Sequence, residues 1–159
     1  MMVGEWNEGF YNQIINDIRE TIVNDCVQLM YEKMREMIYR TVYGQYTPTQ
    51  YQRRYDSNGG LGDMGTYDFD LDVNGNGFTI KMYTNAEGNS NYDNANLSGQ
   101  PLDETIVTGV GYSWTESQIY QNQPYPRDFY KATLDALIDS GELHYILENK
   151  LGEKGIKIV

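Results

Sequence analysis

The chain has 159 residues, a net charge of −11 and a sequence pI near 4.4, which fits one acidic domain of ordinary size. It carries only 12 basic residues against 23 acidic ones. Affinity for nucleic-acid phosphates and for anionic membrane surfaces comes from Lys and Arg. The composition therefore excludes a primary role in binding nucleic acid or a membrane.

Tyrosine is the dominant aromatic residue, with 15 copies against 4 Phe and 2 Trp. Two interpretations stay open: Tyr supplies aromatic anchors at protein–protein interfaces, or it takes the place of Phe in the core. The single cysteine, Cys26, cannot form an internal disulfide, which favours a reducing compartment. We expect no signal peptide and no membrane helix, and hence synthesis and assembly in a cytoplasm.

We expect an α+β fold in one structural domain over residues 1–159. Residues 1–44 predict a long N-terminal helix. Residues 45–101 predict an extended segment, a small antiparallel sheet with a β-hairpin, and a polar loop. Residues 102–159 predict a C-terminal helical part with a helix pair.

The long helix covers residues 5–42, where apolar residues recur at steps of three or four, the spacing that places side chains on one helical face. At about 1.5 Å per residue it exceeds about 50 Å, which is longer than a small domain needs. We therefore expect part of the stripe, Ile14 and Ile18 in particular, to contact another subunit. The stripe comprises Phe10, Ile14, Ile18, Ile22, Cys26, Leu29, Met30, Met34, Met37 and Ile38.

Gly44 and Pro48 are expected to end the helix. Residues 46–55 then predict an extended segment, and residues 56–63 a loop. The extended segment concentrates aromatic and basic groups in an otherwise acidic chain, and we expect its arginines to be exposed in the monomer. It supplies our candidate subunit-contact residues, which are Tyr46, Tyr51, Arg53, Arg54 and Tyr55.

Residues 67–83 predict a β-hairpin with one apolar and one acidic face. In its first strand, apolar residues alternate with Asp68, Asp70 and Asp72, which is the period of a strand. The sequence Asn-Gly-Asn-Gly at residues 74–77 tolerates the positive φ of a tight turn. The second strand alternates again, with Phe78, Ile80 and Met82 on the apolar side.

A polar loop and further helices are predicted after the hairpin. Residues 86–101 are rich in Asn, Gly and Ser, a short helix follows Asp103, and residues 118–125 form a polar connector. Asp128 is expected to cap the last helix, which Ser140-Gly141 interrupts. Residues 156–159 predict a final strand. The expected buried side of the last helix comprises Phe129, Leu134, Leu137 and Ile138.

No motif predicts catalytic or metal chemistry, so we expect no catalytic residue, no metal ligand and no cofactor. Residues 70–75 match the first half of a calcium loop, but its twelfth position, where a bidentate Glu belongs, is Lys81. His144 is the only histidine, and with one cysteine it cannot supply the ligands of a zinc site. We expect His144 on a solvated helix face.

The order of several short motifs resembles a known family. Tyr-Thr-Pro-Thr-Gln-Tyr-Gln-Arg-Arg-Tyr (46–55) precedes Gly-Gly-Leu (59–61), the hairpin and Ile-Val-Thr-Gly (106–109). Pro-Arg-Asp-Phe (126–129) opens the C-terminal helix, and Leu-Gly-Glu-Lys-Gly-Ile (151–156) follows it. Over nearly the whole chain this succession resembles the small neck or tail-completion proteins that join head to tail in tailed bacteriophages. Asp128, in Pro-Arg-Asp-Phe, stands where that family often has Pro.

The resemblance implies a non-enzymatic virion structural protein at the head–tail junction, a ring subunit that joins the head connector to the tail and surrounds the DNA channel. Its implied partners are copies of itself in a hexameric or dodecameric ring, the portal-side connector, and the tail tube or tail terminator protein. Genomic DNA would only pass through, because an acidic ring repels phosphates. The alternatives are a minor capsid or head-decoration protein and, least favoured, a tail-associated enzyme.

Overall fold

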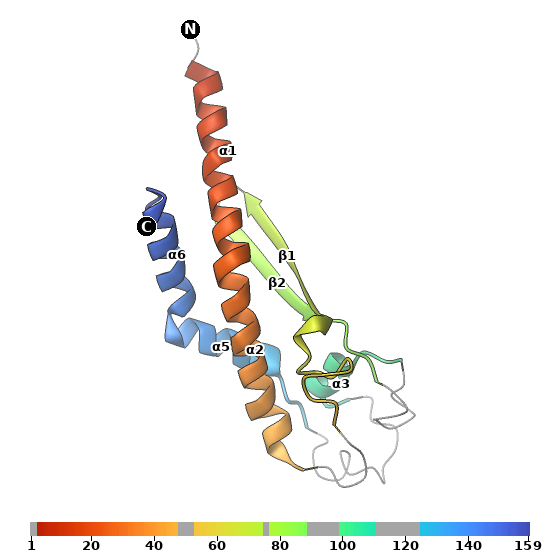
Figure 1. Cartoon of the computed structure of the whole chain (residues 1–159). Coiled ribbons are helices and arrows are strands. Elements are labelled where there is room, and N and C mark those ends of the chain that lie inside the picture. Colours follow the sequence, from red (N-terminus) through yellow and green to blue (C-terminus); the bar gives the residue numbers. More distant parts are fainter. Residues whose placement is uncertain (1–2, 48–52, 75–76, 89–98, 111–124) are drawn as a thin grey trace.

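The computed structural model describes residues 3–47, 53–74, 77–88, 99–110 and 125–159. It confirms the α+β fold: one long helix runs through the molecule, and a hairpin and the C-terminal helices pack along it (Figure 1). The elements in chain order are α1 (Val3–Thr21), the π-helical turn η1 (Ile22–Cys26), α2 (Val27–Thr41), the 3₁₀ turns η2 (Tyr43–Gln45) and η3 (Met64–Thr66), β1 (Tyr67–Asn74), β2 (Gly77–Thr84), α3 (Leu102–Thr108), α5 (Phe129–Ser140) and α6 (Glu142–Glu153).

Helices α1 and α2 form the single long helix that the sequence predicts, joined through η1. Within η1 the N–H of Val27 bonds to the carbonyl oxygen of Ile22, five residues back. A π-helical turn accommodates one residue more than an α-helical turn. Ile22 and Cys26, at the two ends of this turn, both face the core, and each is 0% exposed.

The apolar stripe winds around the helix toward its N-terminus. Phe10, Ile14, Ile18 and Ile22 are four residues apart, and each step of four passes a full helical turn by about 40°. Phe10 is therefore rotated by about 120° from the core-facing side of Ile22. Exposure follows this rotation, since Ile14 and Ile18 are half-buried and Phe10 is 69% exposed.

The hairpin forms in the predicted register. Leu71 lies opposite Ile80 and Asp70 lies opposite Lys81, so that apolar residues share one face. That face packs against the long helix and α6. Residues 70–74 of the half-matched calcium loop thus belong to strand β1, and Gly75 lies outside the described residues. The aspartates of β1 remain exposed on the other face, and they are Asp68, Asp70 and Asp72.

The polar loop after β2 is closed at its base by a β-bridge between Glu87 and Pro101. Helix α3 follows, and it is tied to α5 because the Tyr130 hydroxyl donates to the Asp103 carboxylate at 2.9 Å. Most of the predicted loop and most of the predicted connector, residues 89–98 and 118–124, lie outside the described residues.

Helix α5 begins as predicted but presents a different face to the core. The Asp128 carboxylate accepts the N–H of Lys131 at 2.8 Å and caps the helix. The prediction that Leu134 and Ile138 are buried is wrong, because they are 57% and 67% exposed. The helix turns another side toward α2, and the buried residues on that side are Phe129, Thr133 and Leu137.

Helix α6 starts after Gly141, whose φ of 66° is a conformation that glycine adopts without strain. The prediction of a strand at residues 156–159 is wrong. The N–H of Ile156 bonds to the Leu151 carbonyl at 2.8 Å, which turns the chain back onto α6. Residues 156–159 are irregular, and Ile156 and Ile158 pack against the core.

Two clusters of buried side chains along the long helix make the core. The first joins α2 to α5 and to the loop before the hairpin. The second joins η1 to α6 and the hairpin. Tyr31 and Met82 contact both clusters. The first comprises Met34, Ile38, Val42, Leu61, Tyr67 and Phe129, and the second Ile22, Cys26, Val27, Leu147 and Leu151.

Candidate interaction surface

Arg53, in the predicted contact segment, is held by its own chain. Its Nη1 donates to the carbonyl oxygen of Tyr43 at 2.8 Å. Its guanidinium group lies 4.6 Å from the centre of the Tyr46 ring, and that of Arg127 lies 5.9 Å from the same ring. Such cation–π contacts contribute about 0.5–1 kcal/mol each at exposed sites and about 2 kcal/mol when they are desolvated. The two arginines thereby join the segment after α2 to the start of α5.

Arg54 closes the loop that follows. Its Nη2 donates to the carbonyl oxygen of Glu87 at 2.5 Å, which ties the loop to the end of the hairpin. Within the loop, the N–H of Gly62 bonds to the Tyr55 carbonyl at 3.0 Å. A Cβ at Gly60 would lie 2.3 Å from the same carbonyl oxygen, so only glycine fits there. The loop is therefore tightly constrained.

Three tyrosines form an aromatic cluster between α2 and this loop. The ring centres of Tyr39 and Tyr43 lie 5.0 Å apart, and those of Tyr43 and Tyr55 lie 4.9 Å apart, both edge to face. Tyr39 and Tyr55 stack at 6.2 Å. Asp56 links the loop to α2, because its carboxylate accepts a hydrogen bond from the Tyr39 hydroxyl at 2.9 Å and pairs with Arg35 at 2.8 Å.

The hydroxyls of Tyr39 on α2 and Tyr43 on η2 both act as hydrogen-bond donors at neutral pH. Burial raises the pKa of Tyr43 well above its ordinary value, and Tyr43 donates to the Tyr55 carbonyl at 3.3 Å. Burial also raises the pKa of Tyr39, and the hydrogen bond to Asp56 adds to the shift. These bonds hold the Tyr55 backbone in place.

The outer rings of this cluster form an exposed aromatic surface, the tyrosine patch, which we define as Tyr39 and Tyr55. They are 39% and 41% exposed. Tyr55 has a φ of 52°, a left-handed conformation that costs a non-glycine residue about 1–2 kcal/mol. The fold thus holds a bulky aromatic residue in an unfavourable conformation with its ring partly in solvent, which makes the patch a candidate contact surface.

The structure brings together most of the predicted contact segment, with one correction. Arg53 and Arg54 are half-buried and bonded to carbonyl oxygens, so the expectation that they are exposed is wrong. Tyr46 is half-buried, and Tyr51 lies outside the described residues. Sequence reasoning missed Tyr39, although Tyr39 and Tyr43 stand four residues apart, the spacing of neighbours on one helix face.

A second exposed surface lies at the other end of the long helix. We define the N-terminal arm as residues 7–18, whose first turns extend beyond the hairpin and α6 (Figure 1). Phe10 and Tyr11 are 69% and 49% exposed. The sequence predicts Ile14 and Ile18 as contact residues on this helix. Both are half-buried, and Ile18 packs against the second core cluster. The exposed apolar groups of the arm are therefore Phe10 and Tyr11.

Ion pairs fix the base of the arm to α6. Lys154 Nζ lies 3.4 Å from Asp17 and 2.7 Å from Glu20. Exposed ion pairs contribute at most about 1 kcal/mol each, so they orient the arm more than they stabilise it. The C-terminal end of α6 and the arm thus hold a defined position relative to each other.

Within the described ranges, no three His, Cys, Asp or Glu side chains converge as metal ligands. His144 is exposed on α6, as predicted, and its Nε2 lies 3.9 Å from Glu148. Cys26 is buried, and this burial, with the nearby charge of Asp25, raises its pKa to about 11. The nucleophilic thiolate is therefore nearly absent at neutral pH.

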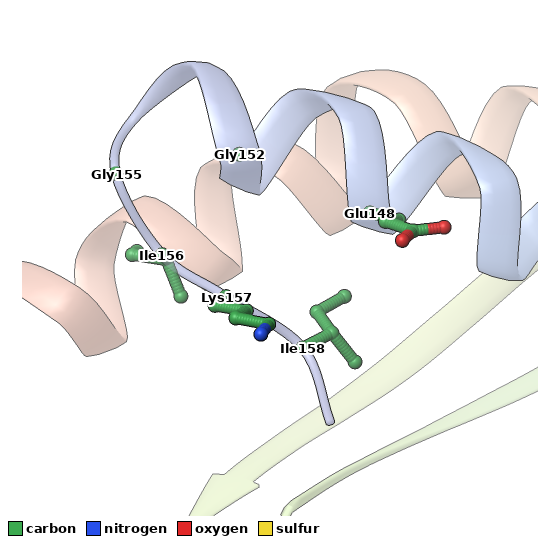
Figure 2. Close-up of a pocket in the computed structure, with 6 residues that line it drawn as sticks. All are labelled: Glu148, Gly152, Gly155, Ile156, Lys157 and Ile158. Atoms are coloured by element: carbon green, nitrogen blue, oxygen red, sulfur yellow. The ribbon is translucent and has the colours of Figure 1, made fainter.

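A shallow hollow of about 300 Å³ lies between α6 and the C-terminal segment (Figure 2). Its lining is a mixture of small, apolar and oppositely charged residues without the convergent polar groups that orient a bound ligand. The lining residues are Glu148, Gly152, Gly155, Ile156, Lys157 and Ile158. Separately, no helix in the described part of the chain combines the length and apolar character needed to cross a bilayer.

Comparison with known proteins places the chain in a family. Searches of curated proteins and of solved structures find no match. A sequence model of the YomN family matches residues 9–153, a span that includes the tyrosine patch and both core clusters. The family name is phage-derived. The chain therefore belongs to the YomN family, a phage-associated family.

Proposed function

We propose that the protein is a non-enzymatic structural subunit of the phage neck, where copies form a ring that joins the head to the tail. The N-terminal arm carries the proposal. Phe10 and Tyr11 precede every residue of both core clusters along the long helix, and both are exposed in the free chain. Burying an apolar side chain of this size in a neighbouring subunit contributes about 1.5–3 kcal/mol. The arm thus gives each copy an apolar surface that can bind the neighbouring subunit.

The positions of the two exposed surfaces support a ring. The arm and the tyrosine patch lie at opposite ends of the long helix (Figure 1). Phe10 and Tyr39 are separated along it by about 40 Å, at about 1.5 Å per residue. A ring needs two different surfaces on each subunit, one that meets the preceding copy and one that meets the next. The arm and the patch supply two such surfaces.

The charge distribution supports passage of DNA through the ring. Asp68, Asp70 and Asp72 line the exposed face of the hairpin, in a chain with a net charge of −11. If this face borders the channel, it repels the phosphates and lowers friction on the moving genome. The phage-associated family and the motif order that resembles neck proteins point in the same direction.

The proposal is tested by removing the gene from an infectious phage and supplying the protein in trans. We expect electron micrographs of the deletion to show DNA-filled heads and complete tails that are not joined. The supplied wild-type protein should restore joined particles, and a variant in which both Phe10 and Tyr11 are replaced by Ser should not.

Two other results would contradict the neck assignment. Joined particles with fragile or misshapen heads would place the protein on the capsid, as a decoration or minor capsid protein. Joined and fully infectious particles without the protein would exclude a structural role in the virion. In the first case, labelled antibody would bind the head surface and not the junction.

A further inference from the structure

The π-helical turn η1 lies between the arm and the part of the long helix that packs against α5. Its main-chain hydrogen bond from the Val27 N–H to the Ile22 carbonyl spans five residues, whereas each hydrogen bond of an α-helix spans four. The turn therefore takes up one residue more than an α-helical turn does. Such turns are rare in proteins, and they occur frequently at functional sites.

The extra residue allows Ile22 and Val27 to face the same part of the core. At about 100° per residue, five residues of an uninterrupted α-helix turn by about 500°, which would leave the two side chains about 140° apart. Both are nevertheless buried in the second core cluster, at 0% and 4% exposed. In η1 five residues replace four α-helical ones, so the two side chains lie about 40° apart. The turn thus rotates α1 back by about 100° and keeps its apolar side on this cluster.

Tyr11 follows the direction that η1 gives to α1. It stands seven residues before Ile18, and seven residues turn by about 700°, within about 20° of two full turns. Ile18 packs against the second core cluster, so Tyr11 points to the side of the molecule on which that cluster lies. Tyr11 is 49% exposed there, in the turns of the arm that extend beyond the hairpin and α6 (Figure 1). A neighbouring subunit would meet Tyr11 on that side.

We infer that η1 keeps the arm in phase with the core, by taking up one residue that would otherwise rotate the arm away from the side it presents to a neighbour. This positioning role rests on the proposed function of the arm as a subunit contact. The number of residues in the turn carries the role, and not their identity, since Val23 and Asn24 are exposed. A residue removed from the turn should leave the arm where it is, whereas a residue removed from α1 should redirect it.

Deletion of Asn24, or separately of Val23, tests whether the turn takes up the residue. In either variant Ile22 and Val27 stand four residues apart, and the main-chain hydrogen bond between them becomes an α-helical one. We expect both turn deletions to fold, to keep the direction of the arm, and to enter phage particles at the wild-type level.

The matched control deletes Asn16, an exposed residue of α1. The preceding part of the arm should rotate by about 100°, which displaces its side-chain ends by about 8 Å on a helix about 10 Å wide, and incorporation should fall by about tenfold. Nitroxide labels on ketone-bearing amino acids at Asn12 or Gln13, each paired with one at Thr79, report this direction as a distance in the free protein. All three positions are exposed. One Ala inserted after Gln13 should restore the label distances in the Asn16 deletion and change them in the Asn24 deletion.

Two results would overturn the inference. The first is a change of label distances in the turn deletions equal to that in the Asn16 deletion. The second is unfolding of both turn deletions, because the core would then need the residue that the turn is inferred to absorb. Failure of the proposed function looks different: label distances as expected, with wild-type incorporation of the Asn16 deletion, would sustain the effect of η1 on the arm and contradict the arm's role as a subunit contact.

Discussion

Tyr67 donates its hydroxyl proton to the main-chain carbonyl of Leu61 at 3.0 Å, inside the first core cluster. The bond fastens the constrained loop to the start of the hairpin. Tyr67→Phe removes the donor and leaves the buried carbonyl without this partner, so the free energy of unfolding should fall by about 1–3 kcal/mol. Chemical denaturation measures the change. Tyr145→Phe, at a site that is 68% exposed, is the control and should change it little.

Arg53 and Arg54 should stabilise the free monomer. Each guanidinium donates to a main-chain carbonyl in a half-buried site. Replacing both by Ala should lower the free energy of unfolding by about 2 kcal/mol in total. Arg40→Ala, at a side chain that is 71% exposed, is the matched control and should have almost no effect. Equal melting temperatures of the double variant and the control would show that the carbonyl contacts contribute nothing.

Phe10 and Ile22 lie on the same stripe but should behave in opposite ways when replaced by Asp. Phe10 is 69% exposed, so Phe10→Asp should change monomer stability by less than about 1 kcal/mol and prevent incorporation into particles. Ile22 is 0% exposed, so Ile22→Asp buries a charge and should unfold the chain. Thermal melts and particle incorporation are measured in parallel. Incorporation of Phe10→Asp at the wild-type level would show that the arm is not a contact.

Cys26 should make the protein less stable in alkaline solution. Its pKa is raised from 9.0 to about 11 in the folded state, chiefly by burial. As pH rises through this window the unfolded chain loses the thiol proton first, so stability is full below about pH 9 and falls by up to about 3 kcal/mol toward pH 11. Denaturation at about pH 8 and pH 10 should show a larger loss in wild type than in Cys26→Ala. The same loss in both would exclude the thiol as its source.

The hairpin and the long helix are predictable because their patterns are local. Alternation fixes the two faces of β1, and the predicted turn sequence is flanked by the paired residues Asn74 and Gly77. Leu134 and Ile138 were misplaced because apolar spacing alone does not say which side of α5 meets α2. The prediction of a final strand is wrong for a similar reason. Ile156 and Ile158 are apolar enough for a strand, but the hydrogen bond from the Ile156 N–H to the Leu151 carbonyl directs the chain onto α6.

The candidate surfaces were less predictable than the fold. Arg53 looked exposed because its bonding partner, the Tyr43 carbonyl, is a backbone group that no sequence pattern reveals. The tyrosine patch needs the positive φ of Tyr55, which depends on the close packing of the loop around Gly60. On the long helix, steps of four predict a single face, although over three such steps the side chains turn steadily away from it.

This rotation has a consequence for how the arm can vary among related chains. The core clusters hold the helix from about Ile18 onward, and nothing in them constrains the residues that precede it. Adding or removing one residue there would move the arm's apolar end by about 1.5 Å and swing it by about 100° around the axis. The number of residues near the N-terminus thus sets both the reach and the direction of the exposed apolar side chains, and it can change without any change to the core.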